Sequence, residues 1–159
     1  MKKLLTVALG VAGSALCMAP ALAAPPQPVD STPIVGDFCG FETSIVVSGK
    51  EKVIDKGDGL IYYIGPGQRA TVTNTETGES VTVNIAGSFR DQVQENGDIQ
   101  SVLRGRNLIF GPGVEGLLLT TGRATATFTL PTQQEPLGTA TITSGPQGRL
   151  VNLCDQLAE

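Results

Sequence analysis

The chain has 159 residues, with 15 acidic and 11 basic side chains, a net charge of −4, and neither His nor Trp. This length allows one modest hydrophobic core and is too short for two ordinary domains. The lack of His excludes Ser-His-Asp and Cys-His catalysis, His-ligated zinc and imidazole acid–base chemistry. The acidic balance argues against nucleic acid and anionic membrane surfaces as partners.

Residues 1–23 have the three parts of a secretory signal peptide. Lys2 and Lys3 form a positive start, an apolar stretch follows, and residues 21–23 (ALA) have the small-x-small pattern that signal peptidase accepts. The stretch is shorter than the ~20 apolar residues that a membrane span needs, which disfavours a retained anchor. We therefore expect a secreted, extracellular protein that begins at Ala24 and has no membrane span after signal removal. Losing the two lysines takes its net charge to −6.

Residues 24–36 are rich in proline and poor in apolar side chains, which predicts a flexible linker ahead of a single β domain at 37–159. Cys17 leaves with the signal. The two remaining cysteines, Cys39 and Cys154, lie near the two ends of the mature chain. In an exported protein such a pair predicts a disulfide, with two buried thiols as the alternative. The bond would place the first and last strands side by side.

From residue 38 onward, short apolar or alternating runs separated by glycines are typical of β-strands. Around the polar turn 75–78, alternating Val or Ile and Thr residues predict a hairpin with one buried and one solvated face. The dipeptide Asn96-Gly97 predicts a second hairpin, between strands 88–94 and 99–104. We also expect strands at residues 41–47, 51–54, 60–64, 107–110, 117–130, 139–143 and 149–153. Residues 155–158 are expected to form a single helical turn.

About eight to ten short strands with short connections predict an all-β fold, an antiparallel meander. Such a sheet must bury one face, either in a β-sandwich or by closing into a β-barrel. We favour the closed barrel, because a bond between Cys39 and Cys154 would bring its first and last strands together.

Five side chains are candidate ligand contacts. Arg104, Arg106 and Arg123 would hold an anionic ligand if they point into a barrel, and surface charge is the alternative. Tyr62 and Tyr63 place one ring on each face of a strand, so one packs in the core while the other covers an edge or contacts a ligand. No pattern in the sequence predicts a metal site or a cofactor.

Most carboxylates fall in predicted turns, where acidic side chains remain hydrated. The acidic loop at 55–59 resembles part of a calcium loop but lacks the further oxygen ligands, which favours a solvated turn. A buried acid on a strand would suggest catalysis or binding, and Glu42 and Asp91 are the two fair candidates.

Residues 71–87 (TVTNTETGESVTVNIAG) resemble a TN-x-x-TG-x-S hairpin with an N-I-x-G end that recurs in small exported actinobacterial proteins. Residues 105–110 (GRNLIF) and 121–123 (TGR) resemble the G-x-N-L-x-F and TGR segments of that uncharacterised family. The resemblance implies a shared fold and export and assigns no residue roles. A more distant likeness to allene oxide cyclase and lipocalin barrels rests on architecture alone, which does not carry function.

Together these observations predict a secreted, noncatalytic β-barrel that binds a small apolar or amphipathic ligand, or a cell-envelope partner. The alternative is a cyclase-like or isomerase-like enzyme that uses Arg, Tyr and a carboxylate in a barrel cavity. An inward-facing acid beside Arg104, Arg106 or Arg123 would favour the enzyme. A cavity filled by Val, Ile and Leu would exclude both.

Overall fold

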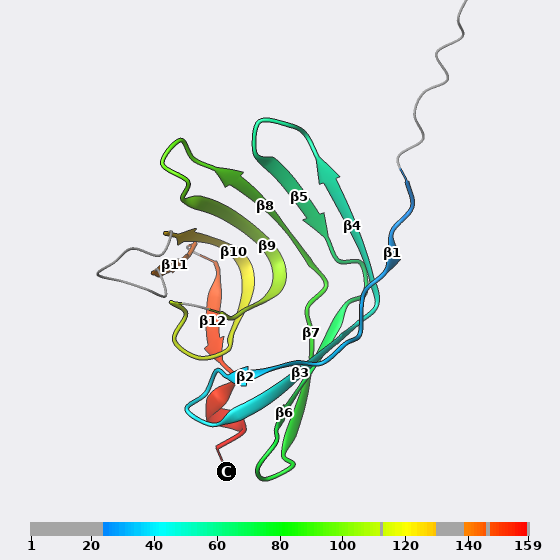
Figure 1. Cartoon of the computed structure of the whole chain (residues 1–159), viewed down its shortest axis with the longest axis vertical. Coiled ribbons are helices and arrows are strands. Elements are labelled where there is room, and N and C mark those ends of the chain that lie inside the picture. The colour runs from blue at the N-terminus through cyan, green and yellow to red at the C-terminus, as the bar shows by residue number, and fades with distance from the viewer. Residues whose placement is uncertain (1–23, 112, 130–138, 146, 159) are drawn as a thin grey trace, which may run out of the picture.

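The computed structural model describes residues 24–111, 113–129, 139–145 and 147–158 (Figure 1). These residues form an all-β, antiparallel fold, which confirms the predicted fold class. The elements are β1 Gln27–Pro28, β2 Ile34–Asp37, β3 Glu42–Ser48, β4 Lys50–Asp55, β5 Leu60–Ile64, β6 Arg69–Asn74, β7 Ser80–Asn84, β8 Gly87–Val93, β9 Ile99–Ile109, β10 Leu118–Phe128, β11 Ala140–Ser144, β12 Arg149–Asn152 and the 3-10 turn η1 Cys154–Gln156. None of the described helical residues forms a segment long and apolar enough to cross a membrane.

The strands form two sheets, and the chain passes from one sheet to the other at three places between β3 and β8. The smaller sheet has the order β2-β3-β6-β7, and the larger has the order β1-β4-β5-β8-β9-β10-β11, with β12 also paired to β10. Only Gly49 separates β3 from β4, while residues 65–68 join β5 to β6 and residues 85–86 join β7 to β8. β3 and β4, and likewise β7 and β8, are therefore nearly continuous as the chain passes from one sheet into the other. Between β5 and β6 the chain makes a turn, in which the N–H of Gln68 donates to the carbonyl of Gly65 at 3.4 Å.

A row of glycines lets β8, β9 and β10 bend at one level. Gly105 of β9 lies opposite both Gly87 of β8 and Gly122 of β10. Gly105 and Gly122 each have φ of 80°, a conformation that other residues rarely adopt. A Cβ on Gly105 would lie 3.2 Å from the Cα of Gly87. The curvature of β9 and β10 is visible in Figure 1. The two strands that the sequence predicts at 99–104 and 107–110 are thus one bent strand.

Strands β11 and β12 lie end to end along the outer edge of β10. Residues 124–128 of β10 pair with β11, and residues 118–121 pair with β12. Between them, the N–H of Gly145 donates to the carbonyl of Arg123 at 2.7 Å. The edge of β10 is thereby covered along its length.

The larger hydrophobic core joins the smaller sheet to β10 and the C-terminal segment. Its buried members are Ile45, Ala70, Val72, Val83, Ile85, Leu117, Leu119, Leu153, Cys154 and Leu157. The side-chain amide of Asn74 also donates to the carbonyl of Leu157 at 3.1 Å, in a buried position. A second, smaller cluster lies on one face of β8, β9 and β10 and consists of Leu103, Ile109, Ala124 and Ala126, with Phe89, Phe128, Val114, Leu118 and Ile142 packed against it. We call this face of the larger sheet the inner face.

The predicted disulfide between Cys39 and Cys154 is confirmed and spans 115 positions of the sequence. The prediction that it brings the first and last strands together is wrong. In the described residues β1 pairs with β4, β2 with β3, and β12 with β10. The bond instead joins the turn between β2 and β3 to η1, because both cysteines lie just outside the strands.

The closed barrel is not confirmed. The strand pairs of the described residues leave β1 and β11 at the edges of the larger sheet, and β2 and β7 at the edges of the smaller one. Part of the segment expected as a linker, 24–36, is strand, since β1 pairs with β4 and β2 pairs with β3. Pro28 is tolerated in β1 because an edge strand can leave one side of its backbone unpaired.

Candidate functional site

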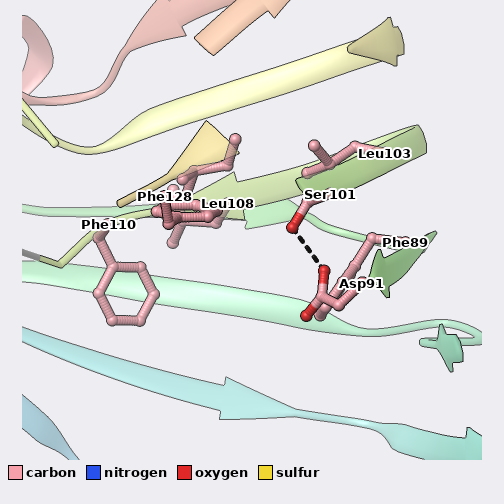
Figure 2. A pocket seen from close by; sticks show the side chains of 8 residues that line it. Phe89, Asp91, Ser101, Leu103, Leu108, Phe110 and Phe128 are labelled. Carbon is pink, nitrogen blue, oxygen red and sulfur yellow. Dashed lines mark hydrogen bonds between the residues drawn. The ribbon is translucent and has the colours of Figure 1, made fainter. Parts of the chain in front are cut away.

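A cavity of about 230 Å³ lies on the inner face of the larger sheet. Figure 2 shows its wall from close by. Six of the eight lining side chains are apolar and two are polar. The lining residues are Phe89, Asp91, Ser101, Leu103, Leu108, Ile109, Phe110 and Phe128. We call this hollow the Asp91 cavity.

Strand register places these residues together. Phe89 and Asp91 alternate along β8, and their direct partners on β9 are Leu103 and Ser101. Because side chains two apart share a face of a sheet, all four project on the same side. Phe128 comes from the far end of β10, which pairs with the start of β9. The cavity is therefore built on three neighbouring strands whose hydrogen bonding fixes its floor.

Aromatic contacts hold two of the cavity's phenylalanines. The ring of Phe89 stacks on the ring of Tyr63 with centroids 4.5 Å apart and an interplanar angle of 17°. Phe110 follows β9 directly and meets Phe38 edge-on, with centroids 5.4 Å apart. Such pairs add to the stability that burial of the rings provides. Phe38 is next to Cys39, so the disulfide region also supports this wall of the cavity.

The two polar side chains of the cavity, Asp91 and Ser101, are hydrogen-bonded to each other. Ser101 is 4% exposed, and its Oγ donates to Oδ1 of Asp91 at 2.5 Å. Burial raises the pKa of Asp91 above its usual value, and the hydrogen bond from Ser101 lowers it in part. Asp91 is one of the two strand acids that the sequence singles out. The other, Glu42, is exposed and accepts a hydrogen bond from the hydroxyl of Thr75 at 2.7 Å.

This arrangement suits binding better than proton transfer. A mostly apolar pocket with one placed polar group holds and orients an amphipathic ligand. Among the described residues that line the cavity, Asp91 is the only ionisable group, so these residues do not supply a paired acid and base. Among the residues that the structure describes, no three His, Cys, Asp or Glu side chains are grouped so as to hold a metal ion.

Three of the five predicted ligand contacts lie together on the opposite, outer face. Tyr62, Arg104 and Arg123 line a pocket of about 310 Å³, which Arg90 also lines. We call it the arginine pocket. Its other lining residues are Ile64, Ser88, Phe89 and Val102. Phe89 borders both hollows. The role of these residues in ligand binding stays a prediction.

The other two predicted contacts are elsewhere. Tyr63 lies on the inner face against Phe89, which places the two neighbouring tyrosines on opposite sides of β5. Arg106 is exposed and lines neither hollow. The inward-facing acid, Asp91, does not line the arginine pocket, because the arginines of that pocket occupy the alternate positions of the same strands.

Sequence reasoning missed the aromatic wall. Phe89, Phe110 and Phe128 are three of the chain's five phenylalanines, and each lies on or just after a predicted strand. A usable signal was present for Phe89, which precedes Asp91 by two positions and therefore shares its face.

Comparisons of the chain with known protein families, curated proteins and solved structures find no match.

Proposed function

We propose that this chain is a secreted, noncatalytic β-protein that binds a small amphipathic ligand in the Asp91 cavity. The observation that carries the proposal is the cavity lining itself: six apolar side chains surround one hydrogen-bonded carboxyl group. The proposal does not require the closed barrel, because three hydrogen-bonded neighbours, β8, β9 and β10, supply most of the wall.

The volume of the cavity fits a small molecule or one small group of a larger one. At about 230 Å³, the cavity exceeds the ~150 Å³ apolar cavity that admits benzene. It is smaller than the ~300 Å³ at which ordinary ligand pockets begin. One substituted ring or a short branched chain matches this space, and the rings of Phe89, Phe110 and Phe128 offer faces or edges to it.

The carboxyl group of Asp91 determines which polar end the ligand carries. A carboxylate only accepts hydrogen bonds, so it favours a donor such as an amine or a hydroxyl. A protonated amine is the better partner, since its charge offsets the cost of burying the ionised carboxylate. We therefore expect a small aromatic or aliphatic amine to bind more tightly than its neutral counterpart.

The enzyme alternative has weaker support. A cyclase or isomerase that combines Arg, Tyr and a carboxylate needs all three in one cavity. Here Arg104 and Arg123 line the outer pocket and Asp91 lines the inner one. The ligand could also be a small group on the surface of a cell-envelope partner. In that case the same cavity would bind the partner through that group.

The first test is native mass spectrometry of the mature protein purified from its own culture medium. We expect a mass excess that disappears on denaturation and a ligand that contains one basic or hydroxyl group. The second test is titration with benzylamine, benzyl alcohol and toluene, followed by amide chemical shifts. Shifts should concentrate on β8, β9 and β10.

Two variants sharpen the titration. Asp91→Asn should weaken benzylamine binding by about tenfold or more, the usual loss when a charged hydrogen-bond partner is removed, and should leave toluene binding unchanged. Asp155→Asn removes an exposed acid on η1 and is the matched control. A bare protein mass together with no localised shifts from any of the three probes would overturn the proposal.

A further inference from the structure

We propose that the arginine pocket on the outer face is a second binding site, for the phosphate group of a phosphate ester. Arg90, Arg104 and Arg123 come from three adjacent strands, β8, β9 and β10, and line one hollow of about 310 Å³. The proposal does not rest on the Asp91 cavity, because the two hollows use opposite faces of the sheet.

The register places positive charges directly across from each other. Arg104 and Arg123 are partners in the ladder between β9 and β10, and Arg104 also lies opposite Ser88 of β8. On the far side of Ser88 the same row continues through Ile64 to Lys52 of β4. The next row places Arg90 between Tyr62 and Val102. The basic residues therefore form a band across the sheet.

Arg104 and Arg123 repel each other across the strand pair, and a bound anion would relieve this repulsion. Like charges directly opposite in an antiparallel pair destabilise it. None of the eight residues that line the arginine pocket is acidic, although the chain has 15 acids and 11 bases. The three arginines are exposed, so they keep their hydration and their free donors. Guanidinium groups have the fork geometry that matches phosphate oxygens, so one anion could bridge the cluster.

The number and spacing of the donors favour phosphate over carboxylate. Directly opposed Cβ atoms lie ~4.5–5.5 Å apart, so the guanidinium groups of Arg104 and Arg123 can reach one small anion. A carboxylate has two oxygens, and one guanidinium group can donate hydrogen bonds to both. A phosphate monoester has three terminal oxygens and a charge near −2, so it can accept hydrogen bonds from more than one arginine. The hydroxyl groups of Ser88 and Tyr62 add donors at the wall of the pocket.

The rest of the wall indicates that the phosphate carries an organic group. The ring of Tyr62 and the side chains of Ile64 and Val102 form an apolar side next to the arginines. Ile64 is 39% exposed, which is high for a large apolar side chain on a sheet. A soluble phosphate monoester and the monoester headgroup of phosphatidic acid share this chemistry, and the experiment separates them.

The test uses the mature chain with two probes. Binding of glycerol 3-phosphate is measured by calorimetry, and co-sedimentation of the protein is measured with phosphatidylcholine vesicles that do or do not contain phosphatidic acid. Arg104→Gln should weaken glycerol 3-phosphate binding by about tenfold or more, because it removes a charge-assisted fork. Arg104→Lys keeps the charge without the fork and should not restore full affinity.

Arg106→Gln is the matched control, since Arg106 lies on the same strand, is exposed and is outside the pocket. It should change affinity by less than about twofold, as screened surface charges do. Saturable binding of glycerol 3-phosphate without co-sedimentation supports a soluble ester, and co-sedimentation only with vesicles that contain phosphatidic acid supports a headgroup. Binding of neither probe, or equal losses in the Arg104 and Arg106 variants, overturns the proposal. If Arg104→Gln fails to fold by circular dichroism, Arg123→Gln replaces it.

Discussion

The disulfide between Cys39 and Cys154 closes one of the longest loops that this chain permits, and its removal has a calculable cost. The two cysteines are 115 positions apart. In the chain-entropy treatment, opening a loop of that length increases the entropy of the unfolded chain by an amount worth about 4.8 kcal/mol at 25 °C. We therefore expect Cys39→Ala with Cys154→Ala to lower the free energy of unfolding by about 4–5 kcal/mol.

The structure explains why most of this loss should act through the unfolded state. Leu153 and Leu157, on either side of η1, are each 1% exposed within the larger core. The amide of Asn74 also holds the carbonyl of Leu157. These contacts keep the C-terminal segment docked without the sulfur–sulfur bond. Alanine at the largely buried position 154 introduces no unpaired polar group.

Urea denaturation of the double variant and of the wild-type protein, with and without a reducing agent, measures the effect. The variant and the reduced wild type should unfold at similar urea concentrations. Their m-values should be larger than that of the oxidised protein, because the unfolded chain without a crosslink exposes more surface. A loss below about 2 kcal/mol, the lower end of what native disulfides contribute, would refute the reasoning.

Three further variants test the cavity, the core and the bend. Because burial raises the pKa of Asp91 above its unfolded value of about 3.9, the protonated form stabilises the fold at low pH, and this stabilisation is lost as the pH rises through the folded pKa. The melting temperature of Asp91→Asn, relative to that of the wild type, should therefore rise as the pH increases from about 3 to neutrality. A difference in melting temperature that does not change with pH would contradict this. Leu117→Ala should lower the free energy of unfolding in urea by about 2–5 kcal/mol, whereas Val151→Ala, at a position 40% exposed, should change it by less than about 1 kcal/mol. Gly105→Ala should destabilise more than Gly57→Ala in thermal melts, since both have positive φ but only Gly105 has backbone within 4 Å of the added Cβ; equal losses would mean that close approach is unimportant.

The sequence predicts the hairpins well because their signals are local. The turn at 75–78 joins β6 to β7, with Gly78 at φ of 81°, and the turn at Asn96-Gly97 joins β8 to β9, with Gly97 at φ of 88°. Each depends on the few residues that form it. The passage of β3 into β4 at Gly49 depends instead on how two sheets pack, and the sequence predicts only the two strands.

The Asp91 cavity could be predicted only in part, for a related reason. Asp91 is recognisable as an acid on a strand, and the even cysteine count predicts the disulfide. Phe89 and Phe110, however, are 21 positions apart and Phe110 and Phe128 are 18 positions apart, so the three rings meet only when register and bend are set. Gly105 also leads to a wrong strand boundary. A glycine at this position indicates the end of a strand, whereas β9 continues through it.

The pairing of β8 with β9 is common to both proposed sites. The register that sets Asp91 opposite Ser101 also sets Ser88 opposite Arg104. A slip by one residue would exchange the faces of β9, moving Arg104 inward and Ser101 outward. The Asn96-Gly97 turn prevents this slip through hydrogen bonds from the N–H of Gln94 to the carbonyl of Asp98 at 2.8 Å and from the N–H of Gly97 to the carbonyl of Gln94 at 2.9 Å. This exposed turn contacts neither hollow, yet through the register it determines which chemistry each face of the sheet presents.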